Sequence, residues 1–156
     1  MYSIRPATLG DIAFLTEVVV AVTRAQGRLS ADFNEQDYRL GFAEWTTEQL
    51  EGSATESTTS VIEVDGRDVG RLRVVRTDAA IELAGIQILP EAQSSGIGSR
   101  IIVSLIDEAV ATSRPISLSV EADNPRARHL YQRLGFVETG RTHDEIGMTF
   151  VQALTP

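Results

Sequence analysis

A short loop with two glycines is the first part of the sequence whose residue types could bind a charged group. Residues 93–98 read Gln-Ser-Ser-Gly-Ile-Gly and lie where an expected strand gives way to an expected helix. Gly96 and Gly98 carry no Cβ, so backbone N–H groups can point outward there. With the dipole of the following helix they suit an anion, best a pyrophosphate, and Arg100 adds positive charge in the first helical turn. Taken alone, the pattern is also that of an ordinary glycine-rich turn.

A second block, about 30 residues downstream, contains a tyrosine that could act as an acid. Residues 124–136 read Asn-Pro-Arg-Ala-Arg-His-Leu-Tyr-Gln-Arg-Leu-Gly-Phe. The spacing places Asn124, Ala127 and Tyr131 on one side of an expected helix. A tyrosine hydroxyl there could donate its proton to a leaving group. The alternative is a half-buried tyrosine whose hydroxyl simply finds a partner.

The composition excludes several other kinds of site. The chain has 156 residues, 14 basic residues that are all arginine, 22 carboxylates and a net charge of −8. Without cysteine there is no disulfide, thiolate zinc site or cysteine nucleophile, and without lysine there is no Schiff base or P-loop. The negative charge argues against a general nucleic-acid binder, two histidines are few for a metal site, and no apolar run could span a membrane. We therefore expect a cytoplasmic protein with no metal and no nucleic-acid or membrane partner.

The elements that must position the two blocks follow from the hydrophobic pattern. It predicts the order β-α-α-β-β-β-α-β-α-β-β in a single domain. The expected strands span residues 2–5, 61–64, 68–76, 80–89, 116–120, 136–138 and 146–154, and the expected helices span 8–22, 35–51, 97–109 and 125–134. The strand–helix–strand crossover around residue 93 makes the fourth and fifth strands parallel. The remaining strands are mostly antiparallel, which gives an α/β (α+β) fold with helices on both faces of a mixed sheet.

Three local patterns qualify this outline. Asp65-Gly66 predicts a type I′ hairpin turn, and residues 52–60 predict a polar connection. Tyr38, Phe42 and Trp45 share one face of the second helix. Core packing is the simpler interpretation of these three aromatic residues, and a wall of a substrate pocket is the alternative.

Together, the two blocks resemble the Gcn5-related N-acetyltransferase (GNAT) superfamily. Pro90 to Gly98 matches the Q/R-x-x-G-x-G/A pyrophosphate loop of that superfamily, and Asn124 to Phe136 matches its N-x-x-A-x-x-L-Y-x-x-x-G-F block. Residues 4–8, Ile-Arg-Pro-Ala-Thr, followed by Asp11, resemble its first strand and helix. The resemblance spans nearly the whole chain and implies one N-acetyltransferase domain over residues 1–156.

The resemblance implies acetyl-CoA as cosubstrate, with its pantetheine arm inserted between the fourth and fifth strands. It implies that an amide near Ile88 polarises the thioester carbonyl and that Tyr131 protonates the departing thiolate. The backbone from Ser94 to Ser99 would hold the pyrophosphate, and Asn124 would contact the cofactor near its pantetheine arm. The cofactor-binding residues expected on this basis are Ile86, Ile88, Leu89, Gln93, Ser94, Ser95, Gly96, Ile97, Gly98, Ser99, Arg100, Asn124, Ala127 and Tyr131.

The resemblance also suggests a general base. Glu82 is the first candidate, because it lies eleven residues before Gln93, the spacing of the glutamate base in histone-type members. Its alternation with apolar neighbours is also that of an outward-facing surface glutamate. Glu121 and Asp123 are the next candidates, and a water chain without a protein base is a further alternative.

Other charged residues have weaker expectations. One of Arg126, Arg128 and Arg133 could meet the 3′-phosphate or adenine end of CoA, although a solvated helix face explains them equally well. His129 and His143 are expected at the surface, and the loop that holds His143 can reach the acceptor site in this superfamily.

The sequence thus predicts an acetyl-CoA-dependent N-acetyltransferase that acts on a primary amine by direct attack in a ternary complex. Residues 1–60 hold 9 acidic and 4 basic residues, a net charge of −5, which favours a cationic acceptor, either a small amine or a peptide. The strand at 146–154 is a candidate edge of the sheet through which a homodimer could form, and the sequence alone does not decide whether one does. The alternatives are a non-catalytic acyl-CoA-binding sensor or partner module, and a nucleotide-phosphate binder that uses the glycine loop.

Overall fold

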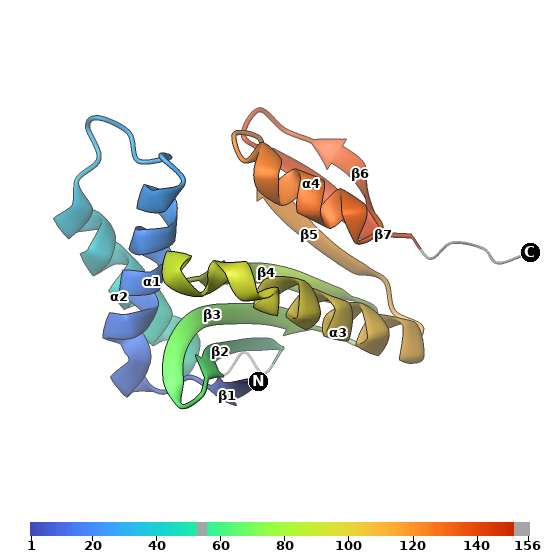
Figure 1. The fold of residues 1–156 in the computed structure, drawn as a ribbon, viewed down its shortest axis with the longest axis horizontal. Helices are drawn as coiled ribbons and strands as arrows, with labels where there is room; N and C mark the ends of the chain where they lie inside the picture. Colours follow the sequence, from blue (N-terminus) through green and yellow to red (C-terminus); the bar gives the residue numbers. More distant parts are fainter. Residues whose placement is uncertain (53–55, 152–156) are drawn as a thin grey trace, which may run out of the picture. The chain divides into compact units, whose positions relative to one another are not determined.

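The computed structural model describes residues 1–52 and 56–151 of the chain, which form a seven-stranded sheet with helices (Figure 1). The strands are β1 (Tyr2–Pro6), β2 (Ser57–Val64), β3 (Arg67–Arg76), β4 (Ile81–Ile88), β5 (Ile116–Glu121), β6 (Phe136–Arg141) and β7 (Glu145–Phe150). The helices are α1 (Ile12–Ala25), α2 (Glu35–Glu51), α3 (Ile97–Ala111) and α4 (Pro125–Arg133), with 3-10 turns at Leu9–Asp11 and Pro90–Ser95. The strand order is β1-β2-β3-β4-β5-β7-β6, in which β4 and β5 pair in parallel, whereas β1–β2, β5–β7 and β6–β7 pair antiparallel.

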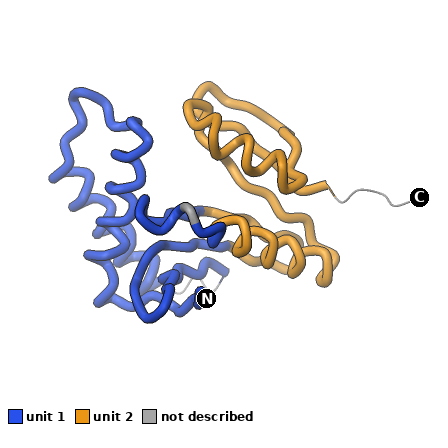
Figure 2. The backbone as a smooth tube through the Cα atoms, viewed as in Figure 1, with its two compact units in different colours: residues 1–74, 85–97 blue, residues 75–84, 98–156 orange. Residues whose placement is uncertain are grey.

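Two compact units make up the chain, and Figure 2 colours them separately. Residues 1–74 and 85–97 form the first unit, and residues 75–84 and 98–156 form the second. The boundary falls within β3, within β4 and at the start of α3. Each unit is described below by itself.

The first unit packs α1 and α2 beside an antiparallel meander. Asp65 and Gly66 both have positive φ, at 51° and 81°, which confirms the type I′ turn between β2 and β3. Val18, Val19 and Val22 of α1 form a buried cluster, against which Phe14, Phe42 and Leu89 pack. The predicted polar connection is shorter than expected, because β2 already begins at Ser57 and pairs with β1. Residues 53–55 of that connection lie outside the described residues.

The second unit holds the parallel strand pair, and here one prediction was wrong. Ile81–Leu83 pairs in parallel with Ile116–Leu118, as the crossover predicts. The strand at 146–154 was expected at an edge of the sheet. Instead β7 pairs with both β5 and β6, so β6 is the edge strand and carries the unpaired backbone groups. The described part of β7 ends at Phe150, and residues 152–154 of the expected strand lie outside the described residues.

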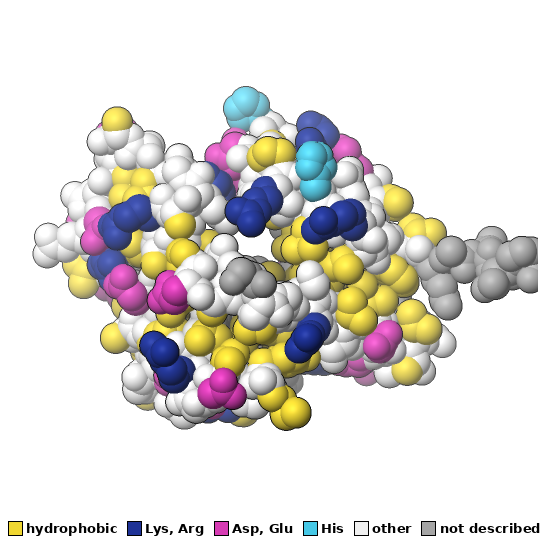
Figure 3. All heavy atoms as spheres, in the orientation of Figure 1, with side chains coloured by type: hydrophobic (Ala, Val, Ile, Leu, Met, Phe, Trp, Pro, Cys, Tyr) yellow, Lys and Arg dark blue, Asp and Glu magenta, His cyan; other side chains and the backbone are white. Residues whose placement is uncertain are grey.

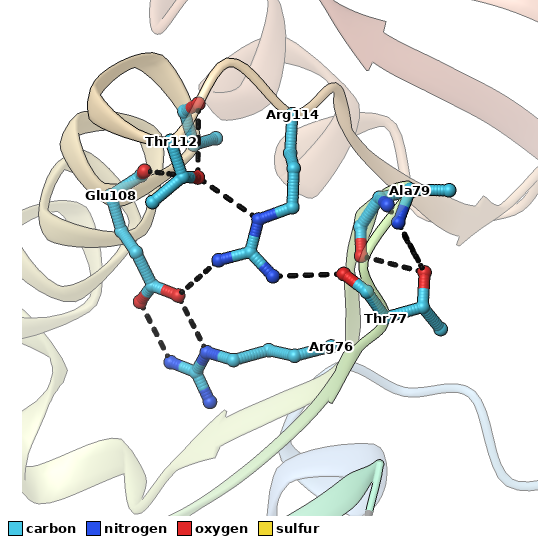
Figure 4. Close-up of polar contacts among 8 residues, drawn as sticks. Arg76, Thr77, Ala79, Glu108, Thr112 and Arg114 are labelled. Carbon is cyan, nitrogen blue, oxygen red and sulfur yellow. Dashed lines mark hydrogen bonds and ion pairs between the residues drawn. The ribbon is translucent and has the colours of Figure 1, made fainter.

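An arginine–glutamate network ties the C-terminal end of α3 to the β3–β4 turn (Figure 4). Arg76 donates two hydrogen bonds to the Glu108 carboxylate, at 2.7 and 2.9 Å. Arg114 donates to the same carboxylate at 3.3 Å and to the Thr77 carbonyl at 2.9 Å. The hydrogen bonds from Arg76 hold the pKa of Glu108 below its ordinary value. The network therefore fixes the chain just before β5 begins.

Asp11 anchors the start of α1 through a second ion pair. Its carboxylate accepts from Arg5 in a bidentate contact at 2.8 and 2.8 Å, and from the Thr8 backbone N–H at 2.8 Å. The residue is 9% exposed. The hydrogen bonds from Arg5 lower the pKa of Asp11 to about 2, so the folded state favours the ionised carboxylate.

Replacing Asp11 with asparagine is expected to lower the free energy of unfolding at pH 7 by about 1–2 kcal/mol, since hydrogen bonds to a charged group are lost. Because the folded pKa lies below the unfolded one, this contribution is present above about pH 4. It is lost as the pH falls from about 4 to about 2. Urea unfolding across that range measures it. Equal acid sensitivity of Asp11→Asn and of the exposed control Asp32→Asn would contradict this assignment.

No helix of the described residues is long and apolar enough to cross a membrane.

Candidate active site

The glycine loop follows β4 directly and leads into α3. Residues 90–95 form a 3-10 turn that ends at Gly96, whose φ of +75° is left-handed and favours glycine. α3 begins at Ile97, and its first N–H groups have no partners within the helix. Ile97 is buried, whereas Ser95, Gly96 and Arg100 are exposed. The loop therefore presents a helix N-terminus that suits an anion.

Gln93 has a structural contact that the sequence did not predict. Its side-chain amide donates to the Ile88 carbonyl at 2.8 Å, and the Ala92 backbone N–H donates to the Leu89 carbonyl at 2.8 Å. These bonds fasten the loop to the last residues of β4. Gln93 thus positions the loop by holding the strand end.

Replacing Gln93 with alanine is expected to weaken CoA binding about three- to tenfold, because the loop loses one hydrogen bond worth about 1 kcal/mol. Calorimetric titration with CoA measures the change. The exposed glutamine in the first turns of α2 supplies a matched control, Gln36→Ala, which should bind CoA normally. Unchanged affinity in Gln93→Ala would show that this hydrogen bond does not shape the loop.

The end of β4 already uses part of its backbone. The Leu89 N–H donates to the Val69 carbonyl on β3 at 2.8 Å, and the Ile88 carbonyl accepts from Gln93. Ile88 is buried, while Ile86 and Leu89 are half-buried. The hydrogen bonds of the Leu89 N–H and the Ile88 carbonyl fix the C-terminal end of β4 against β3 and the glycine loop. A substrate that binds at this strand end would therefore meet a backbone whose position is already set.

The Asn124–Tyr131 block forms α4 as predicted. The Asn124 side chain accepts from the Ala127 N–H at 3.2 Å and Pro125 is the first helical residue, a favoured N-terminal pair. Gly135 follows the helix with φ of +107°, which confirms the left-handed cap. Ala127 and Tyr131 lie one turn apart on the same side of α4. The helix therefore presents Asn124, Ala127 and Tyr131 together, within the second unit.

Tyr131 is held in its protonated form. Its ring packs edge-on against Phe136, with ring centroids 5.9 Å apart. Burial, followed by the negative charge of Glu121, raises the pKa of Tyr131 to about 12. The hydroxyl therefore keeps its proton at neutral pH and can act as a hydrogen-bond donor.

The three candidate bases differ in their surroundings. Glu82 is exposed and points away from the buried Ile81 and Leu83, as alternation predicts. Glu121 is exposed at the end of β5, and its charge acts on Tyr131. Asp123 is exposed just beyond it. Glu121 is thus the candidate that the structure links electrostatically to Tyr131.

The arginines considered for the 3′-phosphate or adenine end of CoA, and the two histidines, are mostly at the surface. Arg126 and Arg133 are exposed. The hydrogen bond from Arg141 lowers the pKa of Glu138, and the charge of the half-buried Arg128 adds to this effect. His129 and His143 are exposed, and Figure 3 shows histidine side chains in cyan at the surface. Among the described residues, no cluster of three or more histidine, aspartate or glutamate side chains could hold a metal ion.

Comparison with protein families identifies this combination of loop and helix. A family profile described as "Acetyltransferase (GNAT) domain" matches residues 29–153. The chain belongs to the GNAT acetyltransferase family. The matched range covers the glycine loop, α4 and nearly all of the second unit, and it leaves out β1 and α1 of the first unit. The mixed sheet with its parallel β4–β5 pair is the GNAT fold.

Solved structures share this fold at low sequence identity. The PaiA N-acetyltransferase of Thermoplasma acidophilum in complex with coenzyme A is 17% identical, with a TM-score of 0.80 over 96% of this chain and 98% of that chain. A spermidine N-acetyltransferase SpeG chimera, from Vibrio cholerae and hSSAT, is 22% identical, with a TM-score of 0.69 over 96% and 95%. An acetyltransferase from Thermus thermophilus is 16% identical, with a TM-score of 0.73 over 96% and 96%.

One feature of this GNAT domain was missed by sequence reasoning. Arg71 of β3 is 5% exposed and lies against the rings of Phe42 and Trp45 from α2. Arginine is rarely buried without a partner, so the sequence did not suggest that Arg71 would be a buried residue. The alternating pattern of β3, with Arg71 and Arg73 between apolar residues, was the available signal.

Proposed function

We propose that this GNAT domain transfers the acetyl group of acetyl-CoA to a primary amine. The observation that carries the proposal is Tyr131, a half-buried side chain of α4 whose hydroxyl is protonated at neutral pH and which stands at the position where the family motif places its acid. A binding module has no need of such a donor. The proposal thus favours an enzyme over a non-catalytic acyl-CoA sensor.

In the proposed complex the CoA pyrophosphate lies at the N-terminus of α3. The left-handed Gly96 and the 3-10 turn before it let the loop present backbone N–H groups there, and Arg100 adds an exposed cation. The backbone of Ile86, Ile88 and Leu89 meets the pantetheine and the thioester. Ser94 to Ser99, Asn124 and Ala127 complete the proposed contacts.

The proposed chemistry is direct attack. The neutral amine adds to the thioester carbonyl while an amide near Ile88 stabilises the developing oxyanion. The C–S bond then breaks, the amide product forms and CoA leaves as a thiolate. The chain has no cysteine, so a cysteine acyl-enzyme is not part of this route.

Tyr131 supports the departing sulfur in this scheme. A thiol of the cysteine type has an ordinary pKa of about 8.5, well below the pKa of about 12 for Tyr131. Equilibrium therefore favours a thiolate that accepts a hydrogen bond from Tyr131 over one that removes its proton outright. The proton that the attacking amine releases finally binds to the thiolate and gives the free thiol of CoA.

The proposed general base is Glu82, with Glu121 as the alternative. Glu82 has the family spacing and is solvent-accessible, which suits deprotonation of the amine through water. Glu121 has the electrostatic link to Tyr131. Comparing the pH profiles of kcat/KM for Glu82→Gln and Glu121→Gln separates the two, because the base variant loses its acidic limb.

Two observations bear on the charge of the acceptor. The acidic excess of residues 1–60 favours a cationic acceptor, and spermidine, the substrate in the name of one structural neighbour, is a suitable cationic probe. However, several of these carboxylates already pair with arginines. Glu17 and Glu35 both bind Arg39, and Asp11 binds Arg5.

The test is thiol release from acetyl-CoA in a panel of primary amines. Acceptor-dependent release above the rate of thioester hydrolysis supports the transferase. Tight acetyl-CoA binding with no acceptor-dependent release would support the sensor, and tight ATP or NAD binding without CoA binding would support the nucleotide-phosphate binder. Ping-pong kinetics would contradict direct attack.

A further inference from the structure

A buried arginine in the first unit has no anionic partner among the described residues. The Arg71 residue is 5% exposed, and one of its terminal nitrogens donates to the Gln87 side-chain oxygen at 3.0 Å. Its Nε is buried without a hydrogen-bond partner in the part of the chain that the structure describes. Burial, followed by the charge of Arg73, lowers the pKa of Arg71 to about 10, so it remains a cation at neutral pH. A buried charge of this kind is costly unless it is paired.

Aromatic rings compensate this charge only in part. The Arg71 guanidinium lies 5.4 Å from the ring centre of Phe42 and 6.0 Å from that of Trp45. Arg73 lies 5.1 Å from the Trp45 ring as well, so two cations share one aromatic ring. Cation–π contacts stabilise such groups, but they do not remove the repulsion between the two arginines. An anion placed between them would.

Two half-buried arginines of the described chain show what is missing here. Arg5 binds Asp11 and Glu63, and Arg76 binds Glu108. In those cases a carboxylate of the protein supplies the negative charge. At Arg71 and Arg73 no described carboxylate forms an ion pair, and Arg73 donates instead to the Ser57 hydroxyl at 3.2 Å.

The location of this cluster connects it with the proposed reaction. Gly85 and Gln87 lie on β4, next to the residues that the proposed function gives to the thioester. A Cβ on Gly85 would lie 2.7 Å from a terminal nitrogen of Arg71, so the guanidinium fills the space beside the β4 backbone. Tyr38 and Trp45 on the α2 side are 38% and 38% exposed. The cluster thus extends from the β4 backbone to partly exposed aromatic side chains of α2.

We propose that the cluster of Arg71, Arg73, Phe42, Trp45 and Gln87 binds the carboxylate of the acceptor, which is therefore an amino acid. This inference rests on the proposed acetyl transfer and names its substrate class. An arginine fork matches a carboxylate, and the Arg71 Nε–H has a bond left to donate. A singly charged carboxylate fits this aromatic site better than a phosphate, because a doubly charged group costs more to desolvate.

The amine of such an acceptor lies one carbon from its carboxylate. Binding the carboxylate at Arg71 therefore places the amine close to the β4 backbone. The aromatic stripe formed by Tyr38, Phe42 and Trp45, whose successive ring centres are 6.1 and 6.1 Å apart, offers an apolar surface for the amino-acid side chain.

The test compares amines that differ only in the carboxylate. Thiol release from acetyl-CoA is measured with phenylalanine, phenylalanine amide and phenethylamine, with the corresponding leucine series, and with spermidine. We expect kcat/KM to be at least tenfold higher for the free amino acids than for their amides or decarboxylated analogues. Activity highest with spermidine or the decarboxylated amines would overturn the inference and leave the proposed transferase intact.

Variants assign the preference to Arg71. Arg71→Met should remove most of the discrimination between the amino acids and their decarboxylated analogues, through a higher KM for the amino acids, and Arg71→Lys should fall between Arg71→Met and the unmodified chain. The exposed Arg67 at the start of the same strand supplies the matched control, Arg67→Met, which should discriminate like the unmodified chain. Full discrimination in a folded Arg71→Met variant, as judged by its melting curve and acetyl-CoA affinity, would also overturn the inference.

The inference can still be tested if the Arg71→Met variant does not fold or if no amine is acetylated. If Arg71→Met does not fold, the preference of the unmodified chain within each matched series still decides. If no amine is acetylated, the proposed function fails, and the carboxylate site is then tested by calorimetric titration of phenylalanine and phenethylamine into the CoA-saturated chain. Tighter binding of phenylalanine would support the site, and equal binding would reject it.

Discussion

Replacing Tyr131 with phenylalanine is expected to lower kcat about 100-fold, the lower range for loss of a proton or hydrogen-bond donor at a leaving group. The ring remains, so its edge-on contact with Phe136 is kept. The KM for acetyl-CoA should change little, because the hydroxyl acts on the thiolate that forms late in the reaction. Thiol-release kinetics under saturating acetyl-CoA measure kcat, and a titration of acetyl-CoA measures its KM.

The half-buried tyrosine of β1 supplies the control for this experiment. Tyr2→Phe makes the same chemical change in the first unit and should leave kcat unchanged. If Tyr131→Phe kept the kcat of the unmodified chain, Tyr131 would be a packing residue and the sensor interpretation would gain. An equal loss in both variants would point to a general effect on folding.

The raised pKa of Tyr131 adds a dependence on pH. The folded pKa of about 12 lies above the ordinary value of 10.0, because burial disfavours the phenolate. The hydroxyl therefore remains protonated, and kcat should not fall between about pH 8 and pH 10 through its ionisation. Because the folded pKa is raised, folding stability associated with Tyr131 is complete below about pH 10 and is lost as the pH rises from about 10 towards 12. Tyr131→Phe should lack this loss.

The parts of the site that the sequence predicted correctly are those with a local cause. Asn124, Pro125 and Gly135 determine the ends of α4 through their own backbone preferences and hydrogen bonds. The type I′ turn at Asp65-Gly66 has the same origin. Such signals need no knowledge of the rest of the chain.

The features that sequence reasoning missed depend on contacts between distant segments. Arg71 is buried because α2 brings Phe42 over β3 and because β4 brings Gln87 to its guanidinium. The alternation within β3 places Arg71 and Arg73 on one face of the strand, but nothing within a few residues of Arg71 shows which segments cover that face. In the same way, the position of β7 between β5 and β6 depends on which strand the final hairpin joins, and either order satisfies the hydrophobic pattern.

Gly70 is a further residue of this kind, and we expect a large effect from replacing it. A Cβ on Gly70 would lie 2.6 Å from the Gln87 carbonyl oxygen and 3.0 Å from Cδ1 of Ile62. The first neighbour is backbone and cannot turn aside as a flexible side chain could. Gly70→Ala should therefore push β3 and β4 apart and lower the free energy of unfolding by about 3 kcal/mol, at the upper end for overpacking.

The same displacement should affect catalysis. Gln87 and Ile88 belong to the strand end that the proposed function places beside the thioester, and a misplacement of about 1 Å at a reacting group can cost about 100-fold in rate. We expect kcat to fall by about that factor in Gly70→Ala under conditions where the variant is still folded. Urea unfolding and thiol-release kinetics on one preparation measure the two effects together.

Gly41 makes the comparison specific, because a Cβ there meets no atom within 4 Å. It lies inside α2, where alanine is favoured over glycine, so Gly41→Ala should stabilise the chain by about 0.5–1 kcal/mol. The two identical substitutions thus have opposite expected signs. If Gly70→Ala were as well tolerated as Gly41→Ala, the close approach of β3 to β4 would not constrain the strand that meets acetyl-CoA. The buried contact between Arg71 and Gln87, which spans the same two strands, would then lose its structural basis as well.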